Sequence, residues 1–115
     1  KVKDKMDINK EMDKDIVVEE DVWIGNHVIL LSGVRLGRGC EVGAGSVVRN
    51  NIPPYAVVIG NPCKVIGFRF TPEEIIEHEK QQYDESERLP YDLLSKNYEK
   101  YFLNRIKEIK QITKI

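Results

Sequence analysis

The fold is decided by residues 18–53, which read VEEDVWIGNHVILLSGVRLGRGCEVGAGSVVRNNIP. Aliphatic residues recur in this stretch at every sixth position: Val18, Ile24, Leu30, Leu36, Val42 and Val48. A second column follows four positions after each of them: Val22, Val28, Val34, Cys40, Ser46 and Ile52. Neither a helical period nor simple strand alternation produces a spacing of six. The repeat therefore predicts a parallel β-helix, in which each hexad forms one flat side of a coil.

Three such sides close a triangular coil, so residues 18 apart in the sequence should stack and point inwards. The expected stacks are Ile24 on Val42, Leu30 on Val48 and Val22 on Cys40. Met12 and Ile16 extend the pattern by one unit, which gives seven hexads from Met12 to Pro53, a little over two coils. Repeat architectures need about three stacked units for stability. We therefore expect the chain to be the C-terminal part of a longer protein; a short domain stabilised by assembly is the alternative.

Three segments follow from this pattern: a charged lead-in over residues 1–17, β-helix coils over residues 18–66, and a helical extension over residues 67–115. Thr71 with Pro72 and Glu74 has the spacing of a helix N-cap and capping box, which predicts a helix over Pro72–Gln82. A second, longer helix should begin near Pro90. Its apolar stripe consists of Leu94, Tyr98, Tyr101, Phe102, Ile106, Ile109 and Ile112. We favour packing of this stripe against a neighbouring subunit over packing on the chain's own coils.

Charge is distributed unevenly along the chain. Residues 1–21 carry five Lys against eight Asp or Glu, whereas residues 22–67 carry four basic residues and only Glu41. This weakly basic repeat lacks the dense patch that nucleic acid requires. Scattered cations, among them Arg35 and Arg38, suit a small multiply charged ligand instead, or they only solvate the coil corners. The longest apolar runs are too short to span a membrane, and two cysteines without CxxC spacing suit a reducing cytoplasm and argue against a zinc site.

The order of short motifs in residues 21–66 resembles that of acetyl-CoA-dependent hexapeptide acyltransferases, most closely the galactoside and maltose O-acetyltransferases. The motifs are Val22-Trp23-Ile24-Gly25, Gly43-Ala44-Gly45-Ser46, Ile52-Pro53-Pro54 and Gly60-Asn61-Pro62 followed by Lys64-Val65-Ile66. The tail, Gly67-Phe68-Arg69-Phe70, resembles xenobiotic and polysaccharide acetyltransferases. The resemblance implies a left-handed β-helix and a homotrimer in which coenzyme A lies in the groove between the β-helices of adjacent subunits.

Carried over by position, the resemblance implies six residues at the acetyl-CoA site. It places Asn26 near the thiol, Ala44 along pantetheine, Arg49 and Asn50 at the next corner, and Lys64 near the phosphates. The family usually has Thr-Lys where Arg49-Asn50 stand, and Arg69 could replace a basic residue that is Gly67 here. No metal is implied.

Acetyl transfer to a hydroxyl needs a general base. The resemblance implies a histidine for this role, at a position before Lys1 in this numbering. We interpret His27 as an exposed surface residue and His78 as a solvent-exposed residue of a charged helix. The sequence thus predicts an O-acetyltransferase acting on a sugar or glycan hydroxyl. Acetylation of an antibiotic or a serine-like acceptor is an alternative, as is a non-catalytic hexapeptide scaffold. A carbonic anhydrase relative would need three metal-binding histidines, and the sequence has two.

Overall fold

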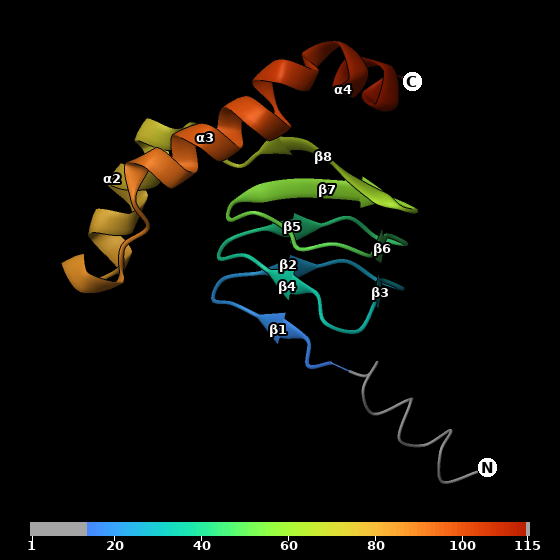
Figure 1. Cartoon of the computed structure of the whole chain (residues 1–115), viewed down its shortest axis with the longest axis horizontal. Coiled ribbons are helices and arrows are strands. Elements are labelled where there is room, and N and C mark those ends of the chain that lie inside the picture. The colour runs from blue at the N-terminus through green and yellow to red at the C-terminus, as the bar shows by residue number, and fades with distance from the viewer. Residues whose placement is uncertain (1–13, 115) are drawn as a thin grey trace, which may run out of the picture.

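A computed structural model of the chain describes residues 14–114, so the expected contribution of Met12 lies outside the described residues. The repeat forms six two-residue strands: β1 (Val17–Val18), β2 (Trp23–Ile24), β3 (Ile29–Leu30), β4 (Arg35–Leu36), β5 (Glu41–Val42) and β6 (Val47–Val48). They pair in parallel across a separation of 18 residues, β1 with β4, β2 with β5 and β3 with β6 (Figure 1). Ile24 pairs with Val42 and Leu30 with Val48, which confirms the predicted three-sided stacking.

The second coil contains the apolar core. Its inward residues Leu36, Val42 and Val48 are buried, as are Val34, Cys40, Ser46 and Ile52 of the second column. The first coil is more open, with Val18 48% and Ile24 45% exposed. Among the described residues, β1, β2 and β3 each have a single paired strand, on the side of the second coil. The inward columns predicted from the hexads are therefore confirmed, but their side chains are buried only in the second coil.

The corners between the strands repeat with the same period as the strands. Positive φ angles occur at every sixth residue, at Asp21, His27, Gly33, Gly39 and Gly45. L-residues with side chains rarely adopt this left-handed conformation. Gly39 is fixed by packing as well as by its φ of 71°, because a Cβ there would lie 2.6 Å from the ring of Tyr55. His27, with a φ of 59°, thus occupies a turn position that three glycines fill elsewhere in the repeat.

The segment that leaves the coils is a hairpin. Strand β7 (Ala56–Gly60) continues the stack, with Val58 paired in parallel to Val42, and β8 (Cys63–Phe68) then returns antiparallel to β7. One sheet consequently has the order β2-β5-β7-β8. We predicted β-helix coils over residues 18–66, and the antiparallel strand within this range was not expected.

The helical extension begins as predicted. Helix α2 spans Pro72–Gln82, and its capping box is complete: the Glu74 amide donates to Oγ1 of Thr71, and the Thr71 amide donates to the Glu74 carboxylate. A short 3-10 helix, Glu85–Glu87, follows. The second predicted helix is divided into α3 (Tyr91–Tyr101) and α4 (Ile106–Thr113), with a 3-10 turn at Leu103–Arg105 between them. None of the described helices is long and apolar enough to cross a membrane.

The apolar stripe of α3 and α4 packs within the chain. Leu94 is buried with Tyr55 and Ile75, and Tyr101 packs against the core of the coils. Ile109 of α4 is buried too. Figure 1 shows α3 and α4 running along the β8 end of the coil stack. These residues of the stripe thus pack within the chain and not, as expected, on a neighbouring subunit, whereas Ile112 at the end of the stripe is 36% exposed.

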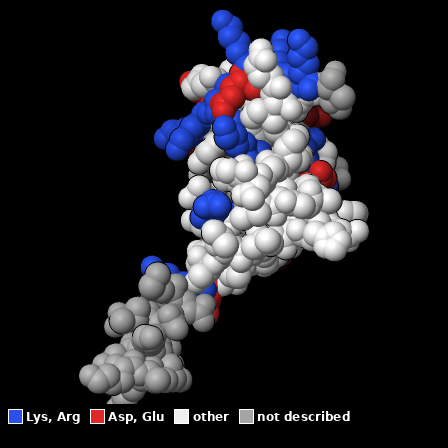
Figure 2. Space-filling view, turned by 90° about the vertical axis from the view of Figure 1, so that its right-hand side faces the viewer, with Lys and Arg blue, Asp and Glu red and all other residues white. Residues whose placement is uncertain are grey.

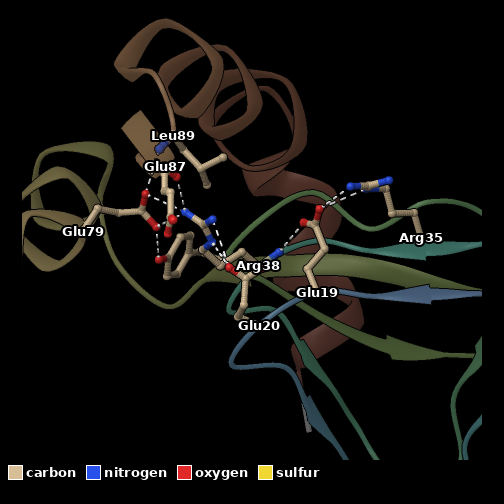
Figure 3. A network of polar contacts seen from close by, with 8 residues as sticks. Glu19, Glu20, Arg35, Arg38, Glu79, Glu87 and Leu89 are labelled. Carbon is tan, nitrogen blue, oxygen red and sulfur yellow. Dashed lines mark hydrogen bonds and ion pairs between the residues drawn. The ribbon is translucent and has the colours of Figure 1, made fainter. Parts of the chain in front are cut away.

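A buried carboxylate fastens α2 to one corner of the coils (Figure 3). Glu79 is fully buried and accepts hydrogen bonds from Arg38 Nη1 at 3.0 and 3.2 Å, from the Tyr55 hydroxyl and from the Leu89 amide. Arg38 also pairs with Glu20 at 3.0 Å. A buried ion pair of this kind persists only where hydrogen bonds satisfy its remaining atoms. The network thus holds α2 and the following loop against the corner at Arg38.

Two of the scattered cations and one histidine have partners within the chain near this corner. Arg35 pairs with Glu19, so both Arg35 and Arg38 meet carboxylates of their own chain. His78 is half-buried and stacks on Phe70, with ring centroids 5.5 Å apart. The prediction of a solvent-exposed His78 was wrong. Because α2 packs on the coils through Glu79, the neighbouring His78 lies against the rings of Tyr55 and Phe70.

Candidate functional site

A hollow of about 340 Å³ lies between the end of the coils and the C-terminal helices. It brings together two of the predicted site residues, Asn50 from the corner after β6 and Lys64 from β8. The remaining lining residues are Asn51, Ile52, Pro53, Val58, Cys63, Val65, Lys100, Tyr101, Arg105 and Glu108. The hollow thus has an apolar floor from the coil core and a polar rim.

The rim carries three basic residues and one acidic residue. Lys64, Lys100 and Arg105 face the hollow together with Glu108. Lys64 Nζ lies 3.3 Å from Oε1 of Glu108, and Arg105 Nε donates to Oε2 of the same carboxylate at 2.8 Å. Hydrogen bonding from Arg105, and next from Lys64, lowers the pKa of Glu108 below its usual value. The rim keeps a net positive charge, which suits an anionic ligand.

Arg105 is held in place by the backbone. Its Nη1 donates to the carbonyl of Val65 at 2.9 Å and to that of Tyr101 at 2.8 Å. The second contact is made at the last residue of α3, where carbonyl groups lose their helical partners. Arg105 therefore joins the break between α3 and α4 to strand β8, and it fixes the helical wall of the hollow.

Figure 2 shows where charge gathers on the side of the molecule that carries β3 and β6. Lysine and arginine side chains cluster at the end of the molecule where α4 lies, whereas the face below them is largely uncharged. Sequence analysis missed Lys100 and Arg105. Both belong to the polar side of the predicted amphipathic helix, and helical spacing does not reveal where that side lies relative to Lys64.

A second trough of about 310 Å³ lies along β2, β5 and β7. It is lined by Trp23, Ile24, Gly25, Glu41, Val42, Gly43, Ala44 and Val57. The predicted residues Asn26 and Ala44 belong to stacked turns here, because the amide of Gly45 donates to the carbonyl of Asn26 at 2.9 Å. A Cβ on Gly25 would lie 2.7 Å from the amide nitrogen of Ala44. Ala44 and Asn26 are exposed, so a chain-like ligand can approach the backbone at this edge.

The other two predicted cofactor residues differ in their surroundings. Arg49 is exposed at the corner next to Asn50. Arg69 lies apart from the Lys64 hollow. Its guanidinium is 3.2 Å from Asp21 and 3.4 Å from Glu41, and it donates to the carbonyl of Gly39 at 3.0 Å. The charge of Arg69 is thereby compensated within the chain, beside the Glu41 end of the trough.

The described residues contain no catalytic histidine arrangement. His27 is exposed at its turn, as predicted. Half-buried His78 packs on aromatic rings, and within residues 14–114 no three His, Cys, Asp or Glu side chains form a group that could hold a metal ion. The described residues instead offer a hollow with a basic rim and a separate trough along the coil edge.

Comparison with known proteins identifies the repeat. Residues 15–50 match the family described as bacterial transferase hexapeptide (six repeats). A chloramphenicol acetyltransferase from Klebsiella aerogenes is 46% identical over 59 residues, which is 51% of this chain and 28% of that protein. The matched stretches span 26% to 29% of the curated relatives' lengths.

Two solved structures of acyltransferases are similar to part of this chain. A galactoside acetyltransferase in complex with coenzyme A is 34% identical, with a TM-score of 0.49, over 67% of this chain and 36% of that chain. AntD, an N-acyltransferase from Bacillus cereus in complex with dTDP and 3-hydroxybutyryl-CoA, is 29% identical with a TM-score of 0.50, over 59% of this chain and 35% of that chain. The recognition of a hexapeptide-repeat acyltransferase pattern is confirmed.

Proposed function

We propose that this chain provides the coenzyme A-binding part of an acetyltransferase that transfers acetyl from acetyl-CoA to a hydroxyl of a sugar or glycan. One observation carries the proposal: Asn50 and Lys64, 14 positions apart, meet at a hollow whose rim has three cations and one carboxylate. Phosphate groups are recognised by such cations. The coenzyme A thioester bound to AntD supports the same ligand class.

In this proposal the phosphates of coenzyme A face Lys64 and Lys100, while the pantetheine arm follows the coil edge past Ala44 towards Asn26. The coils wind left-handed, and a neighbouring subunit of a trimer covers the ligand from the other side. A general base removes the acceptor's hydroxyl proton as its oxygen attacks the thioester carbonyl, and the coenzyme A thiolate leaves. We assign that base to a histidine other than His27 and His78. Free thiols at Cys40 and Cys63 suit the cytoplasm as the place of reaction.

The acceptor has a second candidate. The chloramphenicol acetyltransferases among the relatives favour an antibiotic hydroxyl. Assays of acetyl transfer to galactosides, maltose and chloramphenicol, each followed by release of the coenzyme A thiol, separate the two acceptor classes. Turnover of chloramphenicol without turnover of sugars would overturn the sugar assignment and leave the coenzyme A assignment intact.

Lys64→Glu tests the ligand. Loss of a charge-assisted contact and added repulsion should weaken coenzyme A binding by about 1–3 kcal/mol, a factor of about 5 to 150. Lys80→Glu is the matched control, because Lys80 is exposed on α2 and does not line the hollow. Calorimetry with coenzyme A gives both affinities. Equal affinities of the two variants would refute the placement of the phosphates at Lys64, and no binding by the unaltered protein would refute the proposed function.

A further inference from the structure

The cation that the proposed ligand needs already has a carboxylate beside it. Lys64 Nζ lies 3.3 Å from Glu108, and the two side chains are 54% and 45% exposed. Glu108 is the only acidic residue among the described residues that line the hollow. An anion that binds Lys64 therefore meets Glu108 first, either as a competitor or as a source of repulsion.

The two oxygens of Glu108 have different partners. Oε2 accepts from Arg105, whose guanidinium is also tied to the backbone of Val65 and Tyr101, whereas Oε1 faces only the Lys64 ammonium among the interactions of the described residues. Arg105 and Glu108 stand three residues apart at the start of α4. The Arg105 side of the bridge is thus short and anchored, and the Lys64 side is long and exposed. Exposed ion pairs contribute little, so the Lys64 side is the one that exchanges easily.

We propose that Glu108 acts as an internal competitor for Lys64, which a phosphate of the ligand displaces, so that Glu108 sets the affinity of the coenzyme A site. This inference rests on the proposed function. A phosphate group brings about −1.5 to −2 charges and three acceptor oxygens, against a single charge for the carboxylate. Displaced from Lys64, Glu108 keeps its bond to Arg105 and needs no new partner. The helix that forms the wall of the hollow can therefore stay in place during the exchange.

A double-mutant cycle with coenzyme A tests the inference. Glu108→Gln should raise the affinity about 2- to 5-fold, because the competitor loses its charge. The same substitution in a Lys64→Ala background should change the affinity less than 1.5-fold. Glu85→Gln, in the 3-10 helix after α2, removes the same charge at a residue that does not line the hollow and should leave the affinity unchanged.

Two further measurements separate competition from damage to α4. Thermal unfolding of each variant shows whether the helix end still holds. Glu108→Asp keeps the charge but is one methylene shorter, so it cannot bridge Arg105 and Lys64 together and should raise the affinity by a smaller factor than Glu108→Gln. Unchanged or weaker binding in folded Glu108→Gln, or a gain that persists without Lys64, would overturn the inference alone. Absence of coenzyme A binding by the unaltered protein would overturn the proposed function and the inference with it.

Discussion

Replacement of Glu79 by glutamine should weaken the fold far more than any other single carboxylate change on α2. Glu79 is 0% exposed, and all three of its partners, Arg38, Tyr55 and the Leu89 amide, donate to it. A glutamine amide would present an NH₂ group to one of these donors. It would also leave the Arg38 guanidinium without its buried counter-charge.

The size of the effect follows from these contacts. Breaking a buried ion pair by removal of one partner costs about 3–5 kcal/mol. Arg38 keeps Glu20 at 3.0 Å and lies 4.0 Å from the centre of the Tyr83 ring, so we expect the low end, about 3 kcal/mol. For a domain of this size, that corresponds to a fall in melting temperature of about 12–24 °C.

Urea and thermal unfolding of Glu79→Gln measure the loss directly. Glu77→Gln is the control on the same helix. Glu77 is 68% exposed and its ion pair with Lys80 is long, at 4.0 Å. Surface changes of this kind alter the unfolding free energy by no more than about 0.5 kcal/mol. If the unfolding free energies of the two variants differed by less than about 1 kcal/mol, the buried carboxylate would not be what fastens α2 to the coil corner.

Three further predictions concern the cap, the thiols and the turn histidine. Hydrogen bonding from the Thr71 backbone holds the pKa of Glu74 below its usual 4.5. The stability that the Glu74 carboxylate contributes is therefore present above pH 4.5 and is lost as the pH falls through the lowered pKa. Glu74→Gln should consequently lower the melting temperature at pH 7 but not at about pH 2. Burial raises the pKa of Cys40 to about 12, so iodoacetamide at pH 8 should label half-buried Cys63 first. Mass spectrometry locates the label, and rapid labelling of Cys40 in the folded protein would contradict this prediction. His27→Gly should raise the free energy of unfolding by about 0.5–1 kcal/mol, since relief of left-handed backbone strain outweighs the conformational entropy of glycine. The acetyl-transfer rate should change less than about threefold, whereas loss of a general base would lower that rate by a factor of about 10²–10⁴.

The sequence allowed prediction of those features that repeat or that depend on a few adjacent residues. The hexads determined every strand from β1 to β6, because each side of a coil must place one aliphatic residue inwards. The Thr71–Glu74 spacing likewise determined the start of α2, because a capping box is local chemistry. The pairings of Ile24 with Val42 and of Leu30 with Val48, and the cap at Thr71, agree with the predictions to the residue.

Features that depend on distant contacts could not be predicted in this way. Strand β8 forms because β7 offers it an open edge, and residues 63–68 contain no hexad to announce it. The stripe from Leu94 to Ile112 is continuous in the sequence, but Arg105 reaches Val65 across the hollow and the helix is interrupted there. For the same reason Lys100 and Arg105 escaped notice: their place beside Lys64 depends on how the helices return over the coils.

The surroundings of each cation separate structural from ligand-binding roles better than charge alone. Arg38 and Arg69 are largely buried, and each forms an ion pair with at least one carboxylate. If Arg38 bound a ligand, buried Glu79 would lose its ion pair; if Arg69 did, Asp21 would lose its ion pair. Lys64 meets its carboxylate in solvent, where an ion pair contributes little. Lys100 forms no ion pair with any residue between 14 and 114 and lies 5.0 Å from the centre of the Tyr101 ring. An anionic ligand can therefore gain most from Lys64 and Lys100 at the least loss of folding stability, and for this reason we propose the helical end of the coils as the ligand site.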